Sequence, residues 1–210
     1  MAGPHPYEVA LRESREFTLR EAGDYFAGRG RLLETLRRLA SRLDTERVPY
    51  AIVGGLALFE HGYVRMTDDV DVLVTPVGLK RIFERLVGFG YVATHPGSTR
   101  AIRDADSGVR VEFFVTGEFP GDGKPKPVAF PDPLEASEEL QGLRVLRLPR
   151  LIELKLASGM TAPHRLRDLA DVQEIIKVRR LDGSFADQLD PSVRERYREL
   201  QNAVAAAAPD

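Results

Sequence analysis

Three carboxylates are the residues of this chain whose type and spacing point most directly to chemistry. Asp69 and Asp71 alternate with valines in a run of β-forming residues, so their side chains are predicted to lie on one face of a strand, about 6.6 Å apart along the backbone. Burying two unpaired carboxylates on an apolar strand would cost several kcal/mol. Hard divalent cations prefer oxygen ligands, so the pair predicts a metal site.

A second strand carries the third carboxylate. Val109, Val111, Phe113 and Val115 share one face of the run 109–115, and Glu112 lies on the other face with Arg110 and Phe114. We predict Glu112 as the third acid of the metal site. Asp104 and Asp106 are the alternatives for this position.

A pair of glycines precedes the acids. Gly54 and Gly55 follow the apolar run 50–53 and precede a short helix-like segment. A turn of this kind lets phosphate oxygens approach the backbone N–H groups at the start of a helix. Carboxylates that bind metal beside a turn that binds phosphate predict metal-dependent chemistry on a phosphorylated substrate.

The chemistry that such residues support is the transfer of a nucleoside monophosphate to an acceptor hydroxyl. Two Mg²⁺ ions about 3.5–4 Å apart would stabilise the attacking and leaving oxygens, with Mn²⁺ as the alternative ion. Asp69 and Asp71 would hold both ions, and Glu112 would hold the ion nearest the acceptor and assist its deprotonation. Phosphate charge would be neutralised by basic side chains, for which the candidates are Arg65, Lys155 and Arg165.

The elements that position these residues alternate between strands and helices. Amphipathic helices are predicted where leucines recur at 32, 36, 39 and 43, after Pro76, after Pro149 and around 166–176, with a polar helix over 190–204. Short strands are predicted at 91–94, 99–103 and 143–148, and a loop at 121–127. This pattern predicts a small mixed sheet flanked by helices, in the α/β or α+β class.

Composition is that of an ordinary soluble domain. Among the 210 residues 43% are hydrophobic and 30% are charged, the net charge is −2, and cysteine is absent. We expect an N-terminal arm over residues 1–29 with one short helix near 18–26, a catalytic domain over 30–180 and a helical tail over 181–210. No apolar run reaches membrane length, so we expect a cytoplasmic protein without a membrane partner.

The order of these motifs resembles the nucleotidyltransferase superfamily related to DNA polymerase β. Gly54-Gly55, thirteen further residues, Asp69-Val70-Asp71 and a later strand carboxylate match its pattern, although the family usually has Asp where this chain has Glu112. The lead-in 65–69 and the runs 151–155 and 165–172 resemble a stand-alone bacterial branch that includes abortive-infection type IV (AbiEii-like) toxins and small antibiotic nucleotidyltransferases.

The resemblance implies a substrate and partners. It implies a nucleoside triphosphate with Mg²⁺, an acceptor that is RNA, a small molecule or a protein, and a cognate antitoxin as partner. The nucleotide-binding residues that it implies are Gly54, Gly55, Arg65, Thr67, Lys155 and Arg165.

Simpler interpretations stay open for each motif. The acids could lie on a solvent-facing edge strand, Gly54-Gly55 could be an ordinary turn, and Glu112 could be a surface residue. Lys155 could be an amphipathic-helix lysine with its amine in solvent, and Arg165 could form a helix pair with Asp168. The alternative functions are a catalytically weak copy of the fold that binds nucleotide or a partner, as in a toxin–antitoxin system, and a structural metal-binding domain.

Overall fold

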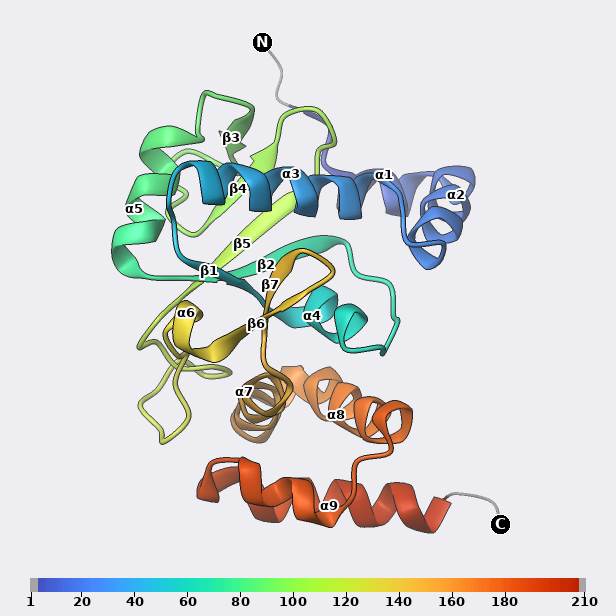
Figure 1. The fold of residues 1–210 in the computed structure, drawn as a ribbon. Helices are drawn as coiled ribbons and strands as arrows, with labels where there is room; N and C mark the ends of the chain where they lie inside the picture. Colours follow the sequence, from blue (N-terminus) through green and yellow to red (C-terminus); the bar gives the residue numbers. More distant parts are fainter. Residues whose placement is uncertain (1–3, 208–210) are drawn as a thin grey trace.

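A mixed β-sheet forms the centre of the computed structural model, which describes residues 4–207 (Figure 1). Its strand order is β3-β4-β5-β2-β1-β7-β6. The strands are β1 (Tyr50–Ile52), β2 (Asp69–Val74), β3 (Tyr91–Ala93), β4 (Ala101–Asp104), β5 (Arg110–Val115), β6 (Ser137–Leu140) and β7 (Leu143–Leu146). The central strands β2 and β5 are parallel, and Asp71 lies opposite Glu112.

Helices flank this sheet. They are α1 (Tyr7–Glu13), α2 (Arg15–Phe26), α3 (Arg31–Thr45), α4 (Gly54–Glu60), α5 (Pro76–Arg85), α6 (Pro133–Ala136), α7 (Leu148–Thr161), α8 (Leu166–Arg179) and α9 (Pro191–Ala207), with 3₁₀ turns at Pro163–Arg165 and Gly183–Gln188. In Figure 1, α3 and α5 lie at the upper side of the sheet, and α7, α8 and α9 lie together below it. The predicted α/β fold, a mixed sheet flanked by helices, is confirmed.

Alternation along β2 and β5 separates the core from the site. Val70, Val72, Val111 and Phe113 are almost completely buried, and the intervening acids are only half-buried. Because successive side chains on a strand point to opposite faces, the valines that anchor the sheet in the core also fix the acids on the other face. The leucines of α3 contribute to the same core.

The N-terminal segment forms two helices, where the sequence predicts one. Helix α1 is held by tertiary contacts, since Glu8 pairs with Arg103 of β4 at 2.7 Å and the Tyr7 amide donates to the Gly108 carbonyl at 3.0 Å. Tyr7 and Tyr25 are buried in the core. Local composition does not report these partners, which is why the pattern of residues 1–29 misses the first helix.

The C-terminal half follows the predicted order with two additions. The helices expected after Pro149, around 166–176 and over 190–204 correspond to α7, α8 and α9. Strand β6 and the short helix α6 are not predicted, because Ser137–Leu140 has two exposed glutamates and pairs with β7 only at the sheet edge. Among the described residues, none of the helices has the length and apolar character needed to cross a membrane.

Candidate functional site

A cleft of about 580 Å³ opens on the face of the sheet that carries the acids. Its walls come from β2 and β5, the start of α4, the segment after β5, and the junction of α7 with α8. Every site residue predicted from the sequence lines this cleft: Gly54, Gly55, Arg65, Thr67, Asp69, Asp71, Glu112, Lys155 and Arg165. Residues separated by about one hundred positions in the chain therefore meet in one place.

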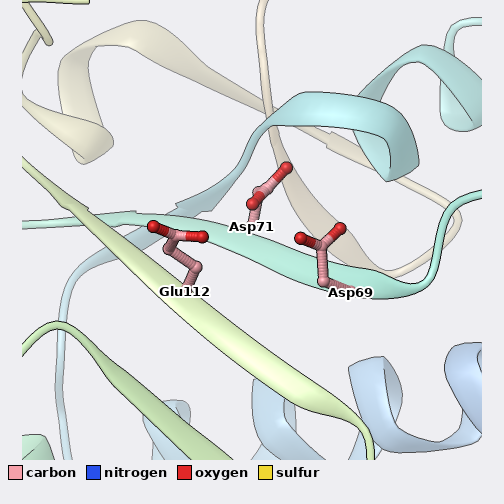
Figure 2. Close-up of side chains that lie close together, drawn as sticks. All are labelled: Asp69, Asp71 and Glu112. Atoms are coloured by element: carbon pink, nitrogen blue, oxygen red, sulfur yellow. The ribbon is translucent and has the colours of Figure 1, made fainter. Parts of the chain in front are cut away.

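The three predicted acids form a compact cluster. Figure 2 shows Asp69 and Asp71 rising from β2 and Glu112 from β5, on the same side of the sheet. One carboxylate oxygen from each residue lies within 4.8 Å of the others. Such a set of hard oxygen donors is suited to a divalent cation.

The electrostatics of the cluster are unfavourable without a cation. Burial, reinforced by the neighbouring carboxylates of Asp69 and Glu112, raises the pKa of Asp71 well above its usual range. Burial also raises the pKa of Asp69, although Thr67 Oγ1 donates a hydrogen bond to Asp69 Oδ1 at 3.0 Å and opposes the shift. Glu112 has a cationic neighbour, because Arg110 Nη2 lies 3.1 Å from its Oε2.

Gly54 lies directly against Asp71, and Gly55 lies against Thr67. Gly54 has a φ of +63°, and a Cβ added there would lie 1.9 Å from Asp71 Oδ2. A Cβ on Gly55 would lie 3.1 Å from the Cβ of Thr67, the residue that bonds Asp69. The Gly54-Gly55 turn is therefore packed against Asp71 and against Thr67, the residue that bonds Asp69, and its backbone borders the cleft.

Two of the basic side chains predicted to contact phosphate, Arg65 and Lys155, belong to a buried ion-pair network. Arg65 binds Asp171 through Nε and Nη2 at 2.7 and 2.9 Å, and Lys155 Nζ lies 2.7 Å from Asp171 Oδ2 and 3.0 Å from Asp168 Oδ1. Ser158 Oγ donates to the other oxygen of Asp168 at 2.7 Å. The network joins the lead-in to β2 with helices α7 and α8.

The sequence interpretation did not include Asp168 and Asp171 among the site residues. The sequence does hold one indication of Asp171, because this residue lies among Leu169, Val172 and Ile175 on the buried side of α8. A carboxylate at such a position needs a buried cationic partner.

The structure bears on the simpler interpretations of Lys155 and Arg165. Lys155 is only 6% exposed, so its amine is enclosed by carboxylates and does not extend to solvent. Arg165 lies 3.6 Å from Asp168, as the simple helix-pair interpretation expects, and also lines the cleft. Asp104 is buried away from the acids, where it pairs with Arg38 and accepts from the amides of Asp106 and Ser107.

Aromatic residues line a further part of the cleft. Phe114, Phe119 and Phe130 come from β5 and the segment that follows it. The rings of Phe114 and Phe130 lie 5.0 Å apart between centroids, at an interplanar angle of 31°. The sequence pattern places Phe114 on the same strand face as Glu112 and predicts no role for it.

Solved structures share this fold. No family model matches the sequence, and no curated protein does. The structure of ANT(2″)-Ia in complex with adenylyl-2″-tobramycin is 12% identical, with a TM-score of 0.51 over 82% of this chain and 96% of that chain. An antigenic nucleotidyltransferase-like protein from Paracoccidioides brasiliensis is 19% identical, with a TM-score of 0.48 over 80% of this chain and 89% of that chain.

A third structure, JHP933 from Helicobacter pylori, is 14% identical, with a TM-score of 0.46 over 82% of this chain and 90% of that chain. The narrower resemblance to the toxin branch stays a prediction. The likeness to ANT(2″)-Ia covers 82% of this chain, so the chain has the nucleotidyltransferase fold.

Proposed function

We propose that this protein transfers a nucleoside monophosphate from a nucleoside triphosphate to an acceptor hydroxyl. The observation that carries the proposal is the cluster of Asp69, Asp71 and Glu112, whose oxygens lie within 4.8 Å of one another beside the Gly54 turn. In the transfer, the acceptor oxygen bonds to the α-phosphorus, the bond from that phosphorus to pyrophosphate breaks, and the acceptor proton passes to Glu112.

The acids fit divalent cations. Asp71 has no ion-pair partner between residues 4 and 207, and burial, together with the neighbouring carboxylates of Asp69 and Glu112, raises its pKa. Asp69 and Asp71 would hold two Mg²⁺ ions, or Mn²⁺ as the alternative, with Glu112 on the ion nearest the acceptor. Bound there, the ions would supply positive charge to the phosphoryl oxygens.

The remaining cleft residues would orient the triphosphate. The Gly54-Gly55 turn borders the cleft beside the acids, where its backbone N–H groups would bind phosphate oxygens, and Arg165 is half exposed at the α7–α8 junction. Lys155 and Arg65 already neutralise Asp168 and Asp171, so they would act on the phosphates while held by those carboxylates.

The proposal includes two candidate classes of acceptor. The tobramycin adduct named with ANT(2″)-Ia makes a small molecule one candidate. The resemblance of the sequence to toxin transferases makes RNA another, with a cognate antitoxin as protein partner.

The proposal is tested by transfer of a labelled nucleoside monophosphate from the triphosphate to an acceptor. The protein is incubated with each α-labelled triphosphate, Mg²⁺ or Mn²⁺, and fractions of cellular RNA, protein and small molecules, with a chelator and the Asp71→Asn variant as controls. We expect metal-dependent label in one fraction and none with Asp71→Asn. Metal-dependent triphosphate binding without transfer would support the catalytically weak alternative. Unchanged triphosphate affinity in Asp71→Asn would overturn the site assignment.

A further inference from the structure

The segment that precedes β2 carries site residues but has little backbone support of its own. Residues 64–68 belong to no helix or strand, and residues 64–67 make no backbone–backbone hydrogen bond with any residue from 4 to 207. The 64–68 segment nevertheless lines the cleft with Arg65, Thr67 and Asp68. Side chains must therefore set its position.

Two helices hold the 64–68 segment through Arg65. From α8, Asp171 binds the Arg65 guanidinium, and from α2 the Tyr25 hydroxyl donates to the Arg65 carbonyl at 3.0 Å. Two residues further along, Thr67 Oγ1 donates to Asp69 Oδ1 at 3.0 Å. A shift of the backbone at Arg65 would therefore displace the hydroxyl that orients the Asp69 carboxylate.

Helices α1 and α2 contact the entry to both strands that carry the acids. On the β5 side, the Tyr7 amide donates to the carbonyl of Gly108, two residues before Arg110, at 3.0 Å. Arg110 is the residue of β5 that lies opposite Asp69. The Tyr7 hydroxyl donates to Glu21 Oε2 at 3.3 Å and so joins α1 to α2. On the β2 side, the corresponding contact is the one made by α2 with the 64–68 segment.

Core packing accounts for the ring of Tyr25 but not for its hydroxyl. Tyr25 is 2% exposed, and its ring lies 5.2 Å from that of Phe59 between centroids. A phenylalanine would bury the same ring without removing a hydroxyl from water, which is costly unless the hydroxyl is hydrogen-bonded. The partner that this hydroxyl has is the backbone of a segment that lines the cleft.

We infer that Tyr25 is a positioning residue for the metal site, whose hydroxyl fixes the 64–68 segment so that Thr67 orients Asp69. Tyr25 does not line the cleft, so its effect passes through the backbone of Arg65. Helices α1 and α2 then serve the site as well as cover the core. The inference rests on the proposed function for the metal and the reaction, but the order of the 64–68 segment can be measured without either.

The test compares two tyrosines that make the same kind of bond. Tyr25→Phe removes the hydroxyl and keeps the ring. Tyr197→Phe is the matched control, because Tyr197 is 0% exposed and its hydroxyl donates to the Asp182 carbonyl at 3.0 Å, outside the cleft. For each protein, NMR order parameters are measured for the backbone amides of residues 64–68 without metal. Affinity for Mn²⁺ alone is measured by electron paramagnetic resonance.

We expect the order parameters of the 64–68 segment to fall in Tyr25→Phe, from about 0.85 toward 0.6. Affinity for Mn²⁺ should fall about fivefold, since one hydrogen bond of ordinary strength changes the population of the binding-competent arrangement by roughly that factor. Tyr197→Phe should lower the Tm about as much as Tyr25→Phe does and change neither of these two quantities. A purely structural role of Tyr25 would not produce this difference.

A double variant tests the route through Thr67. Thr67→Val keeps the shape of the side chain and removes the hydroxyl that bonds Asp69. Because Tyr25 and Thr67 would act in series, adding Tyr25→Phe to Thr67→Val should weaken Mn²⁺ binding by less than about twofold further. A further loss as large as that in Tyr25→Phe alone would overturn the inference.

Other results overturn the inference and the proposed function separately. Unchanged order parameters in Tyr25→Phe, or equal losses of Mn²⁺ affinity in Tyr25→Phe and Tyr197→Phe, would overturn the inference and leave the proposed function intact. Mn²⁺ binding that depends on Tyr25, without transfer of label to any acceptor, would overturn the proposed transfer alone. An unmodified protein that binds no Mn²⁺ would overturn both.

Discussion

Gly54 and Asp71 are in contact in a way that only glycine permits. A Cβ at Gly54 would lie 1.9 Å from Asp71 Oδ2 and 2.8 Å from its Cγ. The carboxylate thus occupies the space that a side chain on the turn would need. Since Gly54 opens α4 and Asp71 belongs to β2, this contact joins the predicted phosphate-binding turn to the predicted metal site.

The first prediction separates that contact from backbone strain. Gly54→Ala should displace Asp71 and abolish metal-dependent triphosphate binding, in addition to the roughly 1–2 kcal/mol cost of a left-handed alanine. Gly88→Ala is the matched control, because Gly88 has a φ of +86° and nothing within 4 Å of an added Cβ. Calorimetric titration and urea unfolding of both variants provide the measurements. Equal triphosphate affinity in the two variants would contradict the prediction.

The second prediction concerns the stability of the metal-free protein. The folded-state pKa of Asp71 is raised by burial, so its favourable contribution is fully present below the unfolded-state pKa of about 3.9 and is lost as pH rises through the folded-state value. At neutral pH the ionised Asp71 carboxylate therefore destabilises the fold. Asp71→Asn should raise the Tm in chelator, by roughly 2–4 °C for each kcal/mol recovered.

Thermal unfolding at several pH values checks this prediction. The difference between Asp71→Asn and the unmodified protein should shrink toward acid pH, and Mg²⁺ should stabilise only the unmodified protein. Asp187→Asn, at a side chain that is 72% exposed, is the control and should leave the Tm unchanged. An Asp71→Asn protein that melts below the unmodified protein in chelator at neutral pH would show that the carboxylate is not under electrostatic stress.

Local patterns predicted the acids because strand alternation is a local property. The valines of β2 and β5 mark the core face, so the acids between them had to face the other way. The register that places Asp71 opposite Glu112 is not local, and neither is the pairing of Arg65 with Asp171 across more than one hundred residues. These contacts arise from packing between distant segments, which single-sequence periodicity does not encode.

The third prediction tests the buried ion-pair network. Asp171 is 2% exposed and neutralises both Arg65 and Lys155, so Asp171→Asn leaves buried cations without compensation. The expected loss is about 3–5 kcal/mol in the free energy of unfolding. Glu174→Gln breaks the exposed pair with Lys177 on the same helix and should cost about 1 kcal/mol or less. Urea unfolding compares the two variants, and similar losses would mean that the network contributes little.

The last prediction separates chemistry from binding at Glu112. This carboxylate lies on β5, apart from the two aspartates of β2, and its neighbour in the metal-free protein is Arg110 at 3.1 Å. Glu112→Gln keeps the shape and removes the charge, so triphosphate affinity should stay within a few-fold. Turnover should fall at least about 10²-fold, as expected when charge that stabilises the transition state is lost.

Single-turnover transfer and calorimetry measure these two quantities. Glu112→Asp should retain more activity than Glu112→Gln, because it keeps the charge and shortens the side chain by one methylene. Glu84→Gln on α5, where the side chain is 59% exposed, is the control for a neutral glutamate substitution. Normal turnover in Glu112→Gln would remove Glu112 from the reaction. Asp104 could not replace it without breaking its 2.9 Å contact with Arg38 and its bonds to the 106–107 turn, so the triad itself would then be the wrong assignment.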